Sequence, residues 1–211
     1  MTRFIRGCGM ALCLGGALTI LINVVITPFM PASKDPVAVM LGTVYLLRQS
    51  ASGIAALLLL AGSIGLHLAQ RPASGRFGTV AFLVAFVGGC CLFAVEFVDV
   101  FVLRAVAQIA PEAVGPLDKA PLLNVAFASA ASLFAAGWIL LCITAWKTKI
   151  LPRRAAQATL LGLFLIPILQ GTLGLAGAIV ANFIFGGGLI SLGWALRKVT
   201  SDTPPNGYGS P

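Results

Sequence analysis

The sequence has 211 residues, of which 59% are hydrophobic and only 9% are charged. An ordinary soluble domain is about 45–50% apolar and about 25% charged. So few charges cannot cover the surface of a water-soluble globule of this size. The composition therefore predicts an integral membrane protein and excludes a disordered chain, a collagen-like repeat and a disulfide scaffold.

The charges are distributed in a way that is typical of membrane flanks. Fourteen Lys and Arg against six Asp and Glu give a formal net charge of +8. The basic residues stand in pairs and fours between apolar runs and form no single patch. We therefore expect the lipid bilayer as the partner, with bound lipid, and we expect no nucleic acid.

Apolar stretches divide the chain into six predicted helices. Four uncharged stretches each fit one span of about 20 residues, and residues 155–196 are long enough for two. The turn between these two is expected near Gln170–Thr172, after Pro167. The predicted spans are about 8–29, 51–70, 78–103, 121–146, 153–169 and 173–196. Together they predict an all-α six-transmembrane-helix bundle in residues 1–199, followed by a disordered cytoplasmic tail over 200–211.

The first apolar segment is expected to be a retained span. Met1–Arg6 would suit the positive start of a signal peptide, but the apolar run that follows exceeds the usual ~7–15 residues. Met30-Pro31-Ala32 also makes a poor cleavage site.

Basic residues are distributed unequally between the two sides of these predicted spans. The positive-inside rule then places both termini in the cytoplasm and the protein in a plasma membrane, with a bacterial inner membrane expected. The inner segments hold Arg3, Arg6, Arg71, Arg76, Lys147, Lys149, Arg153, Arg154, Arg197 and Lys198, and the outer segments hold Lys34, Arg48, Arg104 and Lys119.

Two helical extensions are predicted on the outer side. Asp35-Pro36 is a good helix start, with an N-cap and a proline at the first position. The apolar segment Val37–Leu47 is too short to span, so it either extends the second helix or lies in the interface with Tyr45 as anchor. The third helix runs on until Pro111. We expect these extensions to form a small external helical cap, opposite short inner loops.

Glu96 and Asp99 are the acids that lie within or beside a span, three residues apart and so on one helix face. Acids in a membrane are costly and suggest function. Glu96 lies ~27 Å along the helix from Gly78, near the outer boundary of a ~30 Å core. The pair either binds Arg104 or Arg48 at the base of the cap, or forms a cation or proton site open to the outside.

Three amides map to the same outer layer, namely Asn23, Asn124 and Gln170. They either hydrogen-bond across helices as structural contacts, or line one outward-facing cavity with Glu96 and Asp99.

Glycines are frequent in the last helix, where small residues permit close helix approach. The predicted packing positions are Gly174, Gly177, Gly186, Gly187 and Gly188. The packing would be within the bundle or against a partner subunit. Alternatively, the run Gly186–Gly188 kinks the helix, as in transporters.

Catalytic and metal-binding patterns are missing from the sequence. It has no H-E-x-x-H, Walker A or dinucleotide motif, and the sole His67 lies far from the acids. Haem would need a second chain or a Met ligand. The five cysteines lie in apolar segments as small hydrophobes, with chemistry at Cys90-Cys91 as an alternative. We expect no enzyme, no metal and no cofactor.

In its layout the chain resembles small multi-pass proteins of bacterial inner membranes, without the motif of a particular family. The expected function is a structural or accessory subunit that packs in a larger membrane complex or homo-oligomer. The alternative is a small transporter or sensor with an outward-facing polar site around Glu96 and Asp99.

The topology can be tested with a reporter joined after Lys198. We expect a green fluorescent protein fusion to be fluorescent and an alkaline phosphatase fusion to be inactive, since both termini are placed inside by the Lys and Arg distribution. An active phosphatase fusion would show that this orientation is wrong.

Overall fold

The computed structural model describes residues 2–31, 33 and 35–198, so the expected tail over 200–211 lies outside the described residues. In the described part the chain is helical with short turns and contains no strand, which confirms the all-α prediction. The elements are α1 (Thr2–Ile20), η1 (Leu21–Ile26), η2 (Thr27–Phe29), α2 (Pro36–Leu41), α3 (Thr43–Phe97), η3 (Val98–Leu103), α4 (Arg104–Ile109), η4 (Pro111–Ala113), α5 (Val114–Asp118), α6 (Pro121–Thr148) and α7 (Arg153–Lys198).

Four continuous helical stretches are long and apolar enough to cross a membrane. This agrees with the membrane character expected from the composition. Their bounds are Thr2–Phe29, Thr43–Ile109, Pro121–Thr148 and Arg153–Lys198.

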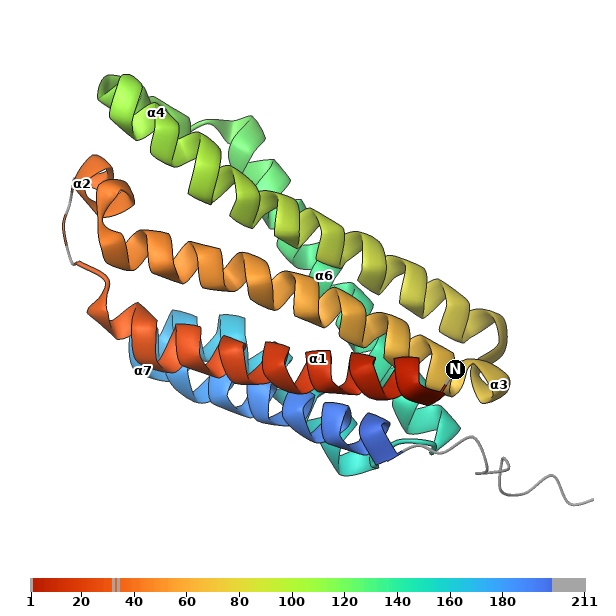
Figure 1. Cartoon of the computed structure of the whole chain (residues 1–211). Coiled ribbons are helices and arrows are strands. Elements are labelled where there is room, and N and C mark those ends of the chain that lie inside the picture. Colours follow the sequence, from red (N-terminus) through yellow and green to blue (C-terminus); the bar gives the residue numbers. More distant parts are fainter. Residues whose placement is uncertain (1, 32, 34, 199–211) are drawn as a thin grey trace, which may run out of the picture.

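Two of these stretches fold back on themselves at a glycine. Gly75 has φ 55° and ψ −149°, and Gly174 has φ 59° and ψ −134°. Residues with a Cβ are strained in such a conformation, whereas glycine accepts it readily. α3 and α7 are therefore each a helical hairpin (Figure 1). We call residues 43–74 and 76–97 the first and second arms of α3, and residues 153–173 and 175–198 those of α7.

The reversal of α7 lies just beyond the expected Gln170–Thr172. Thr172 is still helical and its hydroxyl donates to the carbonyl of Ile168 at 3.0 Å. The backbone leaves helical geometry only at Gly174. The backbone is helical through Gly186–Gly188, so this run does not kink the helix.

The two ends of the bundle differ in what they contain. Figure 1 shows the N-terminus, the reversal at Gly75 and the end of α7 together at one end, which we call the N-terminal end. α2 and α4 lie at the opposite end, which we call the α4 end.

Backbones approach closely wherever glycine or alanine lies between helices. A Cβ added to Gly186 would lie 2.7 Å from the carbonyl oxygen of Gly16, and one on Gly193 would lie 2.6 Å from that of Gly9. These contacts join α1 to the second arm of α7. In the same way, a Cβ on Gly137 of α6 would lie 2.2 Å from the Cα of Ala85 in α3. Small residues therefore set the helix spacing.

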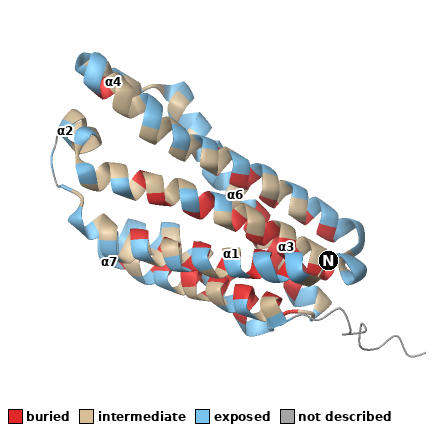
Figure 2. Cartoon of the chain, in the orientation of Figure 1, coloured by how far each residue is buried: buried red, intermediate tan, exposed pale blue. Residues whose placement is uncertain are grey.

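Buried side chains are concentrated toward the N-terminal end (Figure 2). The largest fully buried residues there include Leu12, Leu66, Trp138 and Leu189. Toward the α4 end, residues 121–129 of α6 and 170–176 of α7 contain no buried residue. The protein core thus fills one half of the bundle far better than the other.

The helix signals around α2 are confirmed. Asp35 is the N-cap of α2 and its carboxylate accepts from the amide of Val37 at 3.0 Å, while Pro36 takes the first helical position. α2 ends at Leu41 with Gly42 as its C-cap, and α3 starts at Thr43. The third predicted helix continues through η3 and α4 to Ile109 and stops before Pro111, as expected.

Two adjacent glycines of α7 give a matched test of this packing. Gly186→Ala should lower the free energy of unfolding by about 1–3 kcal/mol, because its Cβ would overlap α1. Gly187 has no atom near its added Cβ, so Gly187→Ala should be neutral or stabilising by up to about 1 kcal/mol. Thermal unfolding in detergent measures both, and equal effects would contradict the packing.

Candidate functional site

Polar side chains from three segments meet near the α4 end. We call Thr27, Arg48, Gln49, Glu96 and Asp99 the polar cluster. Thr27 directly follows the π-helix η1, Arg48 and Gln49 lie in the first arm of α3, and Asp99 lies within the π-helix η3. π-Helices are rare and often lie at functional sites. Their presence on both sides of this cluster indicates a candidate functional site.

A chain of hydrogen bonds runs through the polar cluster. Arg48 Nε donates to the hydroxyl of Thr27 at 3.1 Å, and Arg48 Nη1 donates to Gln49 Oε1. Gln49 Nε2 in turn donates to Asp99 Oδ2 at 2.6 Å. The hydroxyl of Thr27 donates in turn to the carbonyl of Ile22 at 2.8 Å. These hydrogen bonds connect η1 and η2 to the first arm of α3, and that arm to η3.

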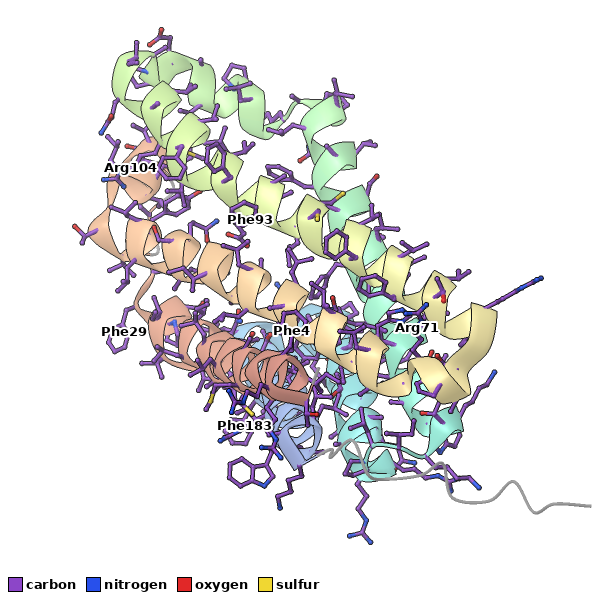
Figure 3. The ribbon with its side chains drawn as sticks, turned by 45° about the vertical axis from the view of Figure 1, so that its right-hand side comes forward. Phe4, Phe29, Arg71, Phe93, Arg104 and Phe183 are labelled. Carbon is purple, nitrogen blue, oxygen red and sulfur yellow. The ribbon has the colours of Figure 1, made fainter. Side chains whose placement is uncertain are left out.

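Glu96 lies one turn before Asp99 in this cluster. Its Oε2 is buried and has no hydrogen-bond partner among the described residues. Across from it is Gly53, whose added Cβ would lie 3.7 Å from Glu96 Cβ and 3.9 Å from the ring of Phe93. Figure 3 shows Phe93 on the second arm of α3, on the side that faces the first arm. A buried carboxylate oxygen without a donor is costly, so it calls for a functional account.

The two arginines near the acids have other partners. Arg48 reaches Asp99 only through Gln49. Arg104 points at the end of α2 (Figure 3). Its guanidinium donates to the carbonyls of Met40 at 2.8 Å, Leu41 at 3.0 Å and Gly42 at 3.3 Å. It therefore satisfies the terminal carbonyls of α2, and α2 is joined to α4 by these bonds.

The expected amides occupy separate places. Asn23 donates to the carbonyl of Thr19 on its own helix at 2.9 Å. Asn124 lines a cavity of about 70 Å³ whose other walls are Met40, Leu103, Val114, Leu117, Leu123 and Phe127. Gln170 is exposed near the reversal of α7. Asp99 accepts its hydrogen bond from Gln49, a residue outside the expected set.

The expected packing glycines also differ from one another. Gly177 faces Leu169 across the α7 hairpin, Gly186 faces α1, and Gly188 faces Thr159. Gly174 makes the reversal, and neither it nor Gly187 has an atom near its added Cβ. Most of these glycines are thus used for contacts inside this chain.

Other chemistry-bearing residues are dispersed. His67 stacks on Phe82 with ring centroids 4.5 Å apart. The five cysteines are free, and Cys8 and Cys142 are buried. Among the described residues no group of three or more His, Cys, Asp or Glu could hold a metal ion.

Thr27 and Gln49 are the residues of the site that the sequence reasoning missed, and Gln49 is the one that a sequence pattern could have revealed. It is only 5% exposed, like Ser63 and Gln70 on the same arm, which are 1% exposed. The spacing of 14 and 7 residues puts the three on one helix face, and a search for polar residues at this period would have found them.

Comparison with protein-family models, curated proteins and solved structures found no match to this chain. The function of this chain is therefore inferred from its own residues.

The bonds of Arg104 can be tested by amide hydrogen exchange. Arg104→Gln should speed exchange in Pro36–Leu41 about tenfold or more, because hydrogen bonds from a charged donor contribute roughly 1.5–3 kcal/mol. Arg76→Gln removes an exposed arginine at the opposite end and should leave exchange there unchanged. Equal rates in Arg104→Gln and the parent protein would contradict the role of Arg104.

Proposed function

We propose that six segments of this chain cross the membrane, with both termini in the cytoplasm and α2, α4 and α5 as a small external cap. Support comes from the two reversals, at Gly75 and Gly174, which divide the four long helical stretches into six arms. Ten of the fourteen basic residues fall on the side assigned to the cytoplasm, and an even number of crossings leaves both termini there.

We propose that the polar cluster binds a monovalent cation or a proton from the outer side, and that the protein acts as a small sensor or transporter. The observation that carries this proposal is the buried Glu96 Oε2 without a hydrogen-bond donor. A carboxyl group at such a position is stabilised by a proton or a cation. Gly53 leaves room beside it.

The charge of the cluster favours a single positive charge. Glu96 and Asp99 carry two formal negative charges, and the nearby Arg48 carries one positive charge. Arg104 does not contribute, because its donors are committed to α2. One added positive charge neutralises the remaining negative charge, whereas a divalent cation would leave the cluster with a net positive charge.

A structural or accessory subunit is the second proposal. It is supported by the apolar surface that this chain leaves uncovered toward the α4 end, which includes Leu122, Val125, Ile168, Leu173 and Leu175. Lipid covers such a surface as well as a partner does. The glycines expected to contact a partner are largely engaged within the chain, so the polar cluster carries the stronger argument.

Cation binding is tested by thermal unfolding of the purified protein at constant ionic strength. Sodium, potassium or lithium chloride is compared with choline chloride, and the series is repeated over pH. One of these cations or a proton should raise the unfolding temperature by several degrees, because a ligand that binds the folded state stabilises it. Glu96→Gln and Asp99→Asn should abolish this response.

Glu112→Gln is the matched control, since Glu112 is an exposed acid of η4 at the same end. It should keep the full response. A parent protein that responds to no cation and whose pH dependence equals that of Glu96→Gln would contradict the cluster proposal. Recovery of a stoichiometric membrane partner in mild detergent would then favour the accessory role.

A further inference from the structure

A groove lies between α1 and the end of α7 at the N-terminal end of the bundle. It has a volume of about 460 Å³ and is lined by Arg6, Gly7, Met10, Trp194, Arg197 and Lys198. The backbones of α1 and α7 nearly touch beside it, at Gly9 and Gly193. This close crossing spreads the larger side chains to either side, so that they form the two walls of the groove.

The walls are basic and carry one large aromatic ring. The guanidinium of Arg197 lies 5.1 Å from the centre of the Trp194 ring, and the ammonium of Lys198 lies 5.4 Å from it. Trp194 is 54% exposed. No acid lines the groove, and within the described residues its three cations take part in no hydrogen bond or ion pair. The groove therefore presents three positive charges to an anion.

An apolar surface continues from the groove along both helices. On α1, Leu14 follows Met10 by one turn and is 53% exposed. On α7, Phe183 is 59% exposed and lies on the outer side of this helix pair (Figure 3). Basic residues at the helix ends beside a long apolar surface match a molecule that has an anionic head and hydrocarbon chains.

We propose that this groove is a binding site for the phosphate headgroup of an anionic phospholipid. Arg6, Arg197 and Lys198 bind the phosphate, and Trp194 takes the interfacial position typical of that residue in membrane proteins. The acyl chains lie along Leu14 and Phe183. The proposal rests on the membrane placement proposed above, but it is independent of the polar cluster.

Trp194 itself reports on the occupant. The protein is reconstituted into vesicles that contain brominated phosphatidylglycerol or brominated phosphatidylcholine at the same mole fraction. Bromine quenches a nearby indole, and subtracting the signal of Trp194→Phe removes the contributions of Trp138 and Trp146. The parent protein should show stronger quenching by phosphatidylglycerol, which gives a relative association constant above one.

Charge-removal variants locate the site. Arg6→Gln/Arg197→Gln should lower that constant by about fivefold for each arginine removed, since one basic residue contributes ~1 kcal/mol to attraction of an anionic lipid surface. Arg153→Gln/Arg154→Gln removes two exposed arginines at the start of α7, outside the groove. This control should leave the relative association constant unchanged. Arg6→Lys/Arg197→Lys retains both charges and should keep most of the preference, which shows whether a loss reflects charge or misfolding.

Three results would overturn the proposal. The first is equal quenching by the two lipids in the parent protein. The second is a loss of lipid preference in Arg153→Gln/Arg154→Gln as large as that in Arg6→Gln/Arg197→Gln. The third is loss of the preference on adding soluble inorganic phosphate, which would indicate a free-phosphate site. Failure to enter vesicles at all would instead contradict the membrane placement. Glu96→Gln should keep the lipid preference, so failure of the cluster proposal is seen separately.

Discussion

Close contact between helix backbones is the interaction on which this structure depends. Within a bilayer, apolar side chains gain little by leaving lipid for protein, so helices associate through packing and hydrogen bonds. Here the packing is provided by glycine pairs that let α1 and α7 touch, at Gly9 with Gly193 and at Gly16 with Gly186. The same approach places the basic side chains of both helices around one groove. A single packing device thus determines the bundle and one of its surfaces.

Toward the α4 end, polar bonds replace this packing. Few residues are buried there, and the bonds of Arg48, Gln49 and Asp99 connect η2 with the first arm of α3 and with η3. Arg104 connects α4 with α2 by donating to three carbonyls. Hydrogen bonds from charged donors are stronger than neutral ones, but they depend on the protonation and partners of each group. The stability of this half of the molecule therefore depends more on charged groups than that of the other half.

Local signals in the sequence predicted local structure well. The apolar runs predicted helices, Asp35-Pro36 predicted the start of α2, and Pro111 predicted the end of α4. The partners of side chains were harder to predict, because they depend on which helices are neighbours. Arg48 and Arg104 were alternative candidate partners of the acids. In the structure Arg48 bonds to Gln49, which in turn bonds to Asp99, and Arg104 binds carbonyls of α2. Carbonyl groups at helix ends carry no sequence signature, so such a partner is easily overlooked.

The buried polar face of the first arm of α3 bears on what the protein could do with a bound cation. Gln49 binds Asp99, and Ser63, two heptads further on, donates to its own helix at the carbonyl of Leu60. Gln70, at the N-terminal end, has both amide atoms buried without a partner in the described part of the chain.

Between the two ends of this face the interior is closed. Leu59, Leu66 and Trp138 are almost completely buried there, and a cation gains no ligands from such side chains. Passage of a cation from the polar cluster to the N-terminal end would thus require the close α1–α3–α6 packing to open, whereas the proposed sensing requires only the polar bonds around Glu96 and Asp99 to change. The closed centre of the bundle therefore favours the proposed role of the polar cluster as a sensor at the α4 end over conduction of a cation through the molecule.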